Sequence, residues 1–502
     1  MPRAWLKVSV AALRLVPLLW TAACAPPERR EPEPAPGPLI DTLAIRAHTA
    51  FLANDLLAGR RAGSPGAGIA AEYLASACRA LGLAPVDGDG FFQSIPLVQV
   101  AIQRSRLEVV RDTERAVFEG PQDFVTDLDL GSSFTGFAGP AMRLEELAGT
   151  DSVPDVRGAI VITESLRDRG VLDVLGARGA AGLILAVRDP ERYDLYARSR
   201  GTTRLLLADR DAQSSLLRPL PTIVVGPAAA EALLGPAAGP RGSISRIEVQ
   251  VDVVRSRVPD QNVICLLMGA DPRARDTAIV FTAHFDHLGI GIPDARGDSI
   301  YNGFSDNAAG VAMLLAVARA LQQPRYIPAH SILFLFPAAE EQGLLGSDYY
   351  TAHPRWPLKR TLAAINLDAG APPGPPSTWR LAGVPGSPLA LLASDVAHIR
   401  GWSATVTEAG PNSDHYPLLA AGVSAIFVIP GPGPYEGMSM DSSRALKSRW
   451  DAYHQSGDEW SEAFPLSGLA RYAEYALLIA HALDRGLTDP GDRSRHGPRR
   501  HR

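Results

Sequence analysis

Residues 276–289, DTAIVFTAHFDHLG, join a short apolar run to a histidine and an aspartate placed directly after it. Such a run has the composition of a buried β-strand. Similar runs recur in the second half of the chain: NVICLLMG (262–269), SILFLFPAAEE (331–341), TLAAINLDAG (361–370) and VSAIFVIPG (423–431). Helical patterns separate them, most clearly at 308–323, where Pro324 follows. This alternation predicts an α/β fold in which a mixed, mostly parallel sheet carries helices on both faces.

The acidic and histidine residues of this half lie just past the predicted strands: His284 and Asp286, Glu340 and Glu341, and Asp368. Open α/β sheets place their binding sites beyond the carboxyl ends of the strands, so we expect these side chains to converge. Two further candidates lie in loops: Asp306 precedes the helix predicted at 308–323, and His454 lies in the late segment DAYHQSGDEW.

Two histidines and three carboxylates form a ligand set that suits two zinc ions. Zinc takes nitrogen and oxygen ligands in a roughly tetrahedral shell and keeps one position open for water in catalytic sites. Two-metal hydrolases use a carboxylate that bridges both ions, and Asp306, on a turn at a helix start, suits that role. One metal would then bind His284 and Asp368, and the other Glu341 and His454.

The neighbours of these ligands have predicted roles as well. Asp286 lies two residues from His284, so both side chains point to one face of an extended segment. The Asp286 carboxylate could therefore accept the second ring N–H of His284 and fix its tautomer. The adjacent Glu340 and Glu341 would point to opposite sides, so one of them, Glu340, is free to act as a general base.

Each element has a simpler interpretation when taken alone. The pair Glu340 and Glu341 could be a solvated surface pair, Asp306 could cap the following helix, and His454 could be a hydrogen-bonding loop residue. Asp368 is less easily explained this way, because a charge after an apolar strand needs a partner. The whole pattern, with every element at a strand end, favours the metal site.

Six segments resemble zinc-dependent metallopeptidase family M28, which includes leucyl aminopeptidases, glutamate carboxypeptidase-like enzymes and glutaminyl cyclases. They are AHFDHLG (283–289), GDSIYNGFSDNAAG (297–310), PAAEEQGLLGS (337–347), INLDAG (365–370), SDHYP (413–417) and YHQSGDEW (453–460). The early loop AGRRAGSPG (58–66) resembles the start of the family's domain. The order of the segments is that of the family, and the resemblance implies a zinc-peptidase (phosphorylase-like) fold.

The resemblance implies the same site residues. It makes His284, Asp306, Glu341, Asp368 and His454 the zinc ligands.

The resemblance also makes Asp306 the ligand that bridges both zinc ions, Glu340 the general base and Asp286 the hydrogen-bond partner of His284. Asp414 and His415 would lie near the substrate pocket, His415 being the main competitor of His454 as a ligand.

Two positions depart from the family pattern. Ser305 stands where an acidic residue often precedes the bridging aspartate, and Ala369 replaces a common methionine. Neither change removes a ligand, but both could tune rate or metal choice.

Composition limits the other possibilities. The 502 residues are 46% hydrophobic and 21% charged, a globular balance, and 49 Lys+Arg against 54 Asp+Glu give a net charge of −5. That balance offers no argument for nucleic-acid binding, which usually needs a basic face. The sequence also has no GxSxG serine-hydrolase motif, P-loop or GxGxxG. Cys78 and Cys265 are expected to be small buried residues rather than part of a disulfide framework.

The N-terminus has the pattern of a secretory signal, with basic and apolar residues followed by TAAC. Cys24 resembles the lipidated cysteine of bacterial lipoproteins, although Arg14 interrupts the apolar region. The predicted divisions are a signal peptide (1–23), a proline-rich linker (24–40), the first part of the peptidase domain (41–118), an insert resembling a protease-associated (PA) domain (119–252), the zinc peptidase domain (253–486) and a basic tail (487–502). We expect an exported protein, in the bacterial cell envelope or secreted, that meets a membrane only through a lipid anchor.

The resemblance implies a zinc-dependent exopeptidase, first of all an aminopeptidase acting on peptides. Two alternatives stay open: a carboxypeptidase or glutaminyl cyclase on the same fold, and a catalytically silent binding protein. Intact ligands and an intact Glu340 argue against the silent protein.

Overall fold

The computed structural model describes residues 39–488, except 89, 112–113, 127–134, 145–152, 166–169, 201–202, 209–219, 236–243 and 369. The predicted signal peptide, Cys24, most of the proline-rich linker, Ala369 and the tail beyond 488 therefore lie outside the described residues. Among the helices that are described, none is both long enough and apolar enough to cross a membrane.

The larger sheet of the described chain is mixed and has eleven strands, in the order β17-β16-β18-β15-β11-β14-β10-β1-β2, with β4 on β10 and β8 on β1. Its strands are β1 (Phe92–Arg111), β2 (Glu114–Glu119), β4 (Gly136–Gly139), β8 (Thr203–Leu207), β10 (Arg246–Leu267), β11 (Ala278–Thr282), β14 (Ser331–Phe336), β15 (Thr361–Leu367), β16 (Thr378–Gly383), β17 (Ser403–Glu408) and β18 (Ala425–Pro430).

Parallel strands form the middle of this sheet. β11 pairs in parallel with β14 on one side and with β15 on the other, and β15 pairs in parallel with β18. Antiparallel pairs flank this centre, where β10 meets β14 and β16 meets β18. Because parallel neighbours end at the same edge, the loops after β11, β14 and β15 meet there. The α/β class predicted from the alternating runs is confirmed.

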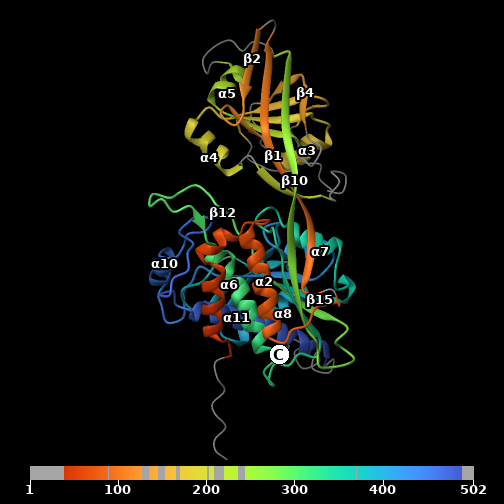
Figure 1. Ribbon diagram of the computed structural model, residues 1–502, viewed down its shortest axis with the longest axis vertical. Helices are drawn as coiled ribbons and strands as arrows, with labels where there is room; N and C mark the ends of the chain where they lie inside the picture. Colours follow the sequence, from red (N-terminus) through yellow and green to blue (C-terminus); the bar gives the residue numbers. More distant parts are fainter. Residues whose placement is uncertain are drawn as a thin grey trace, which may run out of the picture. The chain divides into compact units, whose positions relative to one another are not determined.

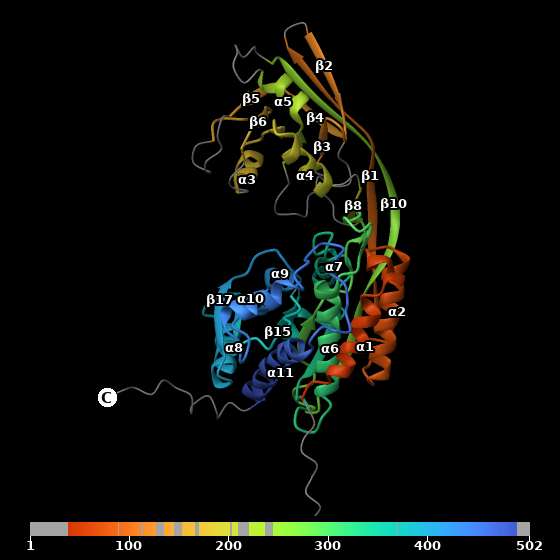
Figure 2. The ribbon, with the colours of Figure 1, turned by 90° about the vertical axis from the view of Figure 1, so that its left-hand side faces the viewer.

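Helices cover both faces of the larger sheet. The helices of this part of the chain are α1 (Thr42–Leu52), α2 (Pro65–Ala80), α6 (Ala309–Ala320), α7 (Leu345–Ala352), α8 (Pro388–Ile399), α9 (His415–Ala420), α10 (Met440–Ser448) and α11 (Ser467–Thr488). On one face, Val280 and Leu333 pack with Tyr350 of α7 and Leu418 of α9. Residues that alternate with these along the strands point to the other face, where α6 packs against β15, α1 and α11 (Figure 2).

Two strands of the larger sheet are unusually long. β1 and β10 are continuous over 20 and 22 residues, whereas a typical strand has about five or six. Residues 255–259 lie inside β10, where they pair with 96–100 of β1. Continuous antiparallel pairing, with one irregularity near Ile102 and Arg104, keeps this ribbon extended through its polar middle (Figure 1).

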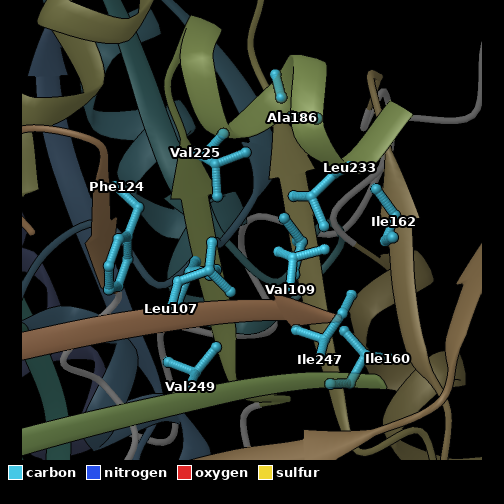
Figure 3. Packing of buried hydrophobic residues seen from close by; sticks show 14 of the residues in the cluster. Leu107, Val109, Phe124, Ile160, Ile162, Ala186, Val225, Leu233, Ile247 and Val249 are labelled. Atoms are coloured by element: carbon cyan, nitrogen blue, oxygen red, sulfur yellow. The ribbon is translucent and has the colours of Figure 1, made fainter. Parts of the chain in front are cut away.

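A second sheet lies between β1 and β10 in the sequence. Its five strands have the order β3-β9-β7-β6-β5, namely β3 (Phe124–Thr126), β5 (Ala141–Arg143), β6 (Ile160–Thr163), β7 (Gly182–Ala186) and β9 (Thr222–Val225), accompanied by α3 (Gly170–Ala177), α4 (Pro190–Arg200) and α5 (Pro227–Leu234). It shares one apolar core with the distal halves of the ribbon: Leu107 and Val109 of β1 and Ile247 and Val249 of β10 pack against Ile160 and Leu233 (Figure 3). These contacts join the insert to the ribbon.

Cys78 and Cys265 form a disulfide between α2 and β10, across a sequence separation of 187 residues. Both side chains are fully buried, as expected, but the expectation that they are unlinked was wrong. A strand cysteine and a helix cysteine from distant segments gave no spacing pattern from which the bond could be read. The bond ties the early helix to β10, the strand that flanks the parallel centre of the larger sheet.

We predict that the double substitution Cys78→Ser, Cys265→Ser lowers the free energy of unfolding by about 2–4 kcal/mol, because the bond closes a long loop in the unfolded chain. Urea unfolding of both proteins measures this difference. Thiol titration of the denatured, unreduced wild type should detect no thiol beyond that of Cys24. Three reactive thiols would contradict the disulfide.

Candidate metal centre

The edge where β11, β14 and β15 end gathers a first group of three buried side chains. His284 follows β11, Asp368 follows β15, and Asp306 lies in the turn Phe304–Ala308 before α6. His284 Nε2 lies 3.0 Å from Asp368 Oδ1 and 3.2 Å from Asp306 Oδ1. One ligand atom from each of these residues can reach a common metal ion.

A second group gathers around the other oxygen of Asp306. His454 Nε2 lies 3.0 Å from Asp306 Oδ2 and 3.2 Å from Glu341 Oε2. His287 Nδ1 lies 2.6 Å from Glu341 Oε1 and 3.9 Å from Asp306 Oδ2. The second metal-binding group found among the described residues consists of His287, Asp306 and Glu341 and does not include the predicted ligand His454. The Asp306 carboxylate thus lies between the two groups, with one oxygen toward each.

The Asp306 side chain does not cap α6. The neighbouring Asn307 does this work, because its Oδ1 accepts the backbone N–H of Gly310 at 3.1 Å. Asn307 Nδ2 donates to the carbonyl of Leu367 at 3.0 Å, directly before Asp368. One side chain therefore ties the start of α6 to the end of β15, and the Asp306 carboxylate remains directed into the site.

His287 is the site residue that sequence reasoning missed. It lies three residues after His284 in the same loop, its side chain is fully buried, and its Nε2 has no hydrogen-bond partner among the described residues. A second histidine in the loop after β11 was a visible signal. Nothing in the sequence, however, indicated that it would turn toward Glu341 rather than toward the core.

Asp286 lies beside His284 but makes a different contact from the one expected. Its carboxylate is 3.7 Å from His284 Nδ1, too far for a hydrogen bond, and the Asp286 carbonyl oxygen lies nearer, at 3.2 Å. The carboxylate instead accepts the backbone N–H groups of Glu340 at 3.0 Å and Glu341 at 3.4 Å. Asp286 therefore holds the loop that carries both glutamates.

Glu340 and Glu341 face different parts of the site. Glu341 meets the two histidines of the second group, whereas Glu340 Oε2 lies 4.0 Å from His284 Nε2. Burial raises the pKa of Glu340 well above its usual value, and Asp368 adds to this while His284 opposes it. A carboxylate with a raised pKa is suited to accept a proton near neutral pH.

The negative charge of the cluster favours a bound cation. Burial alone would lower the pKa of His454, but Asp306 and Glu341 raise it to about 10. Burial would likewise lower the pKa of His284, yet Asp368 and its acidic neighbours raise it well above the usual value. The carboxylates thus favour a cation placed between them, and Asp306 Oδ2 is buried without an aligned hydrogen-bond donor among the residues that the structure describes. Nitrogen and oxygen atoms around such an atom fit divalent zinc.

The segment 413–415 lies next to Asp368. Ser413 Oγ donates to Asp368 Oδ2 and accepts from Asn366 Nδ2 at 2.6 Å. Asp414 is fully buried, and burial raises its pKa to about 7. His415 packs against Phe427, and burial lowers its pKa to about 4. Both side chains are closed off from solvent, and neither belongs to the metal-binding groups found among the described residues.

Comparison with known proteins identifies the part of the chain that carries this site. Residues 262–480 match Peptidase family M28. A "probable leucine aminopeptidase 2" from Aspergillus oryzae is 28% identical over 252 residues, which is 46% of each protein. An "Aminopeptidase" from Pseudomonas aeruginosa is 28% identical over 189 residues, 36% of this chain and 32% of its own.

The matched region thus spans less than half the length of these two relatives. Among solved structures, an aminopeptidase from Aneurinibacillus sp. strain AM-1 has a TM-score of 0.55 at 18% identity. The superposition covers 88% of this chain and 93% of that one, which shows a shared fold.

We predict that Asp286→Ala lowers the free energy of unfolding by about 1–3 kcal/mol, because two backbone N–H groups lose their acceptor. It should also lower catalytic turnover, since the loop of Glu340 and Glu341 loses its support. Urea unfolding and initial rates measure the two effects.

A matched control is Asp294→Ala. Asp294 also accepts two backbone N–H groups, from Arg296 at 2.8 Å and Asp298 at 3.0 Å, but in an exposed loop. Equal losses of stability in the two variants, with turnover retained in both, would contradict the role given to Asp286.

Proposed function

We propose that this chain is a zinc-dependent aminopeptidase that removes the N-terminal residue of peptides. The observation that supports it most is the Asp306 carboxylate, with one oxygen 3.2 Å from His284 and the other 3.0 Å from His454. A carboxylate placed between two groups of nitrogen and oxygen ligands is the arrangement that a two-metal hydrolase needs.

His284, Asp306 and Asp368 would hold one zinc ion, and Asp306, Glu341 and His454 the other. His287 competes with His454 for the second group, but its Nδ1 is engaged with Glu341 Oε1 at 2.6 Å. We assign His287 the role of orienting Glu341, since metal-binding carboxylates are usually held by such a hydrogen bond. Asp286 and Ser413 support the site in the same way, through the loop of Glu341 and through Asp368.

Two bound zinc ions would polarise the scissile carbonyl and lower the pKa of a water molecule enough for attack near neutral pH. Glu340 accepts the proton of the attacking water and later delivers it to the nitrogen of the leaving amine, as the C–N bond breaks. Its burial fits this task, because it raises the pKa of the carboxyl group well above its usual value. Asp286 keeps Glu340 in place through the backbone N–H.

The names of the two relatives favour an aminopeptidase over the alternatives. A carboxypeptidase or a glutaminyl cyclase is the second candidate.

We also propose that the protein is exported, with residues 1–23 as signal peptide and Cys24 as a candidate for lipidation. The buried Cys78–Cys265 disulfide supports export, because such bonds persist in oxidising compartments such as the periplasm and the extracellular space.

We predict that the chain without residues 1–24 cleaves aminoacyl-p-nitroanilides but not their N-acetylated forms. Chelator should abolish cleavage and zinc should restore it, because the substrate's free amine and the metals are both required. Release of the C-terminal residue from blocked peptides would instead support a carboxypeptidase, and loss of ammonia from an N-terminal glutamine a cyclase. A protein that holds neither metal nor activity would favour the silent binding protein.

Substitution of the general base tests the mechanism. We predict that Glu340→Gln binds zinc as the wild type does and loses at least about 10²-fold in kcat, the usual scale of general-base catalysis. Metal analysis and steady-state kinetics measure the two properties. Turnover close to that of the wild type would rule Glu340 out as the base.

A further inference from the structure

Arg60 is a fully buried arginine beside the metal centre. It ends the short helical segment Asp55–Arg60 that follows α1, and 1% of it is exposed. Burial lowers the pKa of Arg60 to about 10, with Asp286 and Asp458 opposing the shift, so its guanidinium remains charged at neutral pH.

The guanidinium of Arg60 is satisfied by backbone carbonyls from three segments. Its Nε donates to Phe285 O at 2.8 Å, Nη1 to Asn302 O at 2.5 Å and Nη2 to Gly303 O at 3.1 Å. Nη1 also donates to Leu52 O at the end of α1. Arginine normally pairs with carboxylates, and here its rigid fork of donors spans neutral oxygens on separate loops.

Three of these carbonyls, those of Phe285, Asn302 and Gly303, belong to the two loops that carry the candidate ligands. Phe285 lies between His284 and Asp286, and Asn302 and Gly303 lead into the turn that holds Asp306. One side chain therefore fastens the loop after β11 to the loop before α6.

Asp458 holds the same loop from its amide side. Its carboxylate accepts the backbone N–H of Ser305 at 2.9 and 3.0 Å and that of Asp306 at 3.2 Å. Its carbonyl accepts the N–H of Phe304 at 2.9 Å. Residues 302–306 are thus held by a buried cation at their carbonyls and by a buried anion at their amides.

The space around this loop allows little adjustment. Gly303 has φ +60°, and a Cβ there would lie 2.3 Å from the Asp306 carbonyl oxygen and 2.4 Å from the His287 ring. The backbone N–H of His287 donates to the carbonyl of Arg60 at 3.3 Å. A shift of the Arg60 segment would therefore move the metal-binding loops with it.

We propose that Arg60 and Asp458 are positioning residues of the metal centre, which set the place of the Asp306 carboxylate by holding residues 302–306. The proposal rests on the proposed function, since it requires Asp306 to bind metal. Metal sites need their ligands held to within about 0.5 Å, so a loosened loop should weaken the shared ligand first.

Arg60→Lys is the most informative variant, because it keeps the positive charge and removes the planar guanidinium with its several N–H donors. A single ammonium group cannot reach carbonyls on three segments in the directions that the guanidinium does. Arg61→Lys is the matched control: the side chain of the neighbouring arginine donates to Thr203 Oγ1 at 3.4 Å and, among the described residues, to neither metal-binding loop.

The experiment is zinc titration of the metal-free full chain by calorimetry, together with thermal unfolding with and without zinc. We expect Arg60→Lys and Asp458→Asn to bind zinc at least tenfold more weakly and to show a smaller zinc-induced rise in Tm. Their kcat should fall at least tenfold while KM changes less than threefold. Arg61→Lys should match the wild type in each respect.

A purely structural role would give a different result. The variants would then lose the same Tm with and without zinc and would keep the zinc affinity of the wild type, which would overturn the proposal. If Arg60→Lys does not fold, Asp458→Asn decides by the same criteria. The wild-type titration tests the metal centre separately, and a wild type that binds no zinc would overturn the proposed function together with this inference.

Discussion

The concentration of carboxylates in a dry interior is the constraint on which the rest of this site depends. Asp286, Asp306, Asp368, Asp414 and Asp458 are all at least 95% buried. A buried charge costs several kcal/mol unless hydrogen bonds or opposite charges compensate it. Backbone N–H groups do this for Asp286 and Asp458, histidines do it for Asp306 and Asp368, and the guanidinium of Arg60 lies among them. Two divalent cations would complete the compensation.

The parallel centre of the sheet is what brings these side chains together. The loops after β11, β14 and β15 leave one edge, and α6 starts beside them because Asn307 links its first turn to the end of β15. The β1–β10 ribbon belongs both to the larger sheet and to the core of the insert. Its proximal part pairs with β14 in the larger sheet, while its distal part fills the core of the insert (Figure 3).

Sequence alone predicted what depends on local pattern. The strands around 278–282 and 331–336 and the helix near 309–320 follow from apolar periodicity, and their order placed the candidate ligands at one edge. Contacts between segments that are distant in the chain could not be predicted from the sequence. The Cys78–Cys265 bond and the continuity of β10 through residues 255–259 depend on partners far away in the chain. The hydrogen bonds of Asp286 and the turn of His287 toward Glu341 depend on loop geometry that no spacing encodes.

The central claim is that Asp306 lies between two metal ions. The most direct test is a crystal structure of the zinc-loaded chain with anomalous scattering recorded at the zinc edge. The account predicts two peaks about 3.5–4 Å apart, on either side of the Asp306 carboxylate. The first should lie against His284 and Asp368, and the second against Glu341 and His454. A single peak, or two peaks that do not share Asp306, would contradict it.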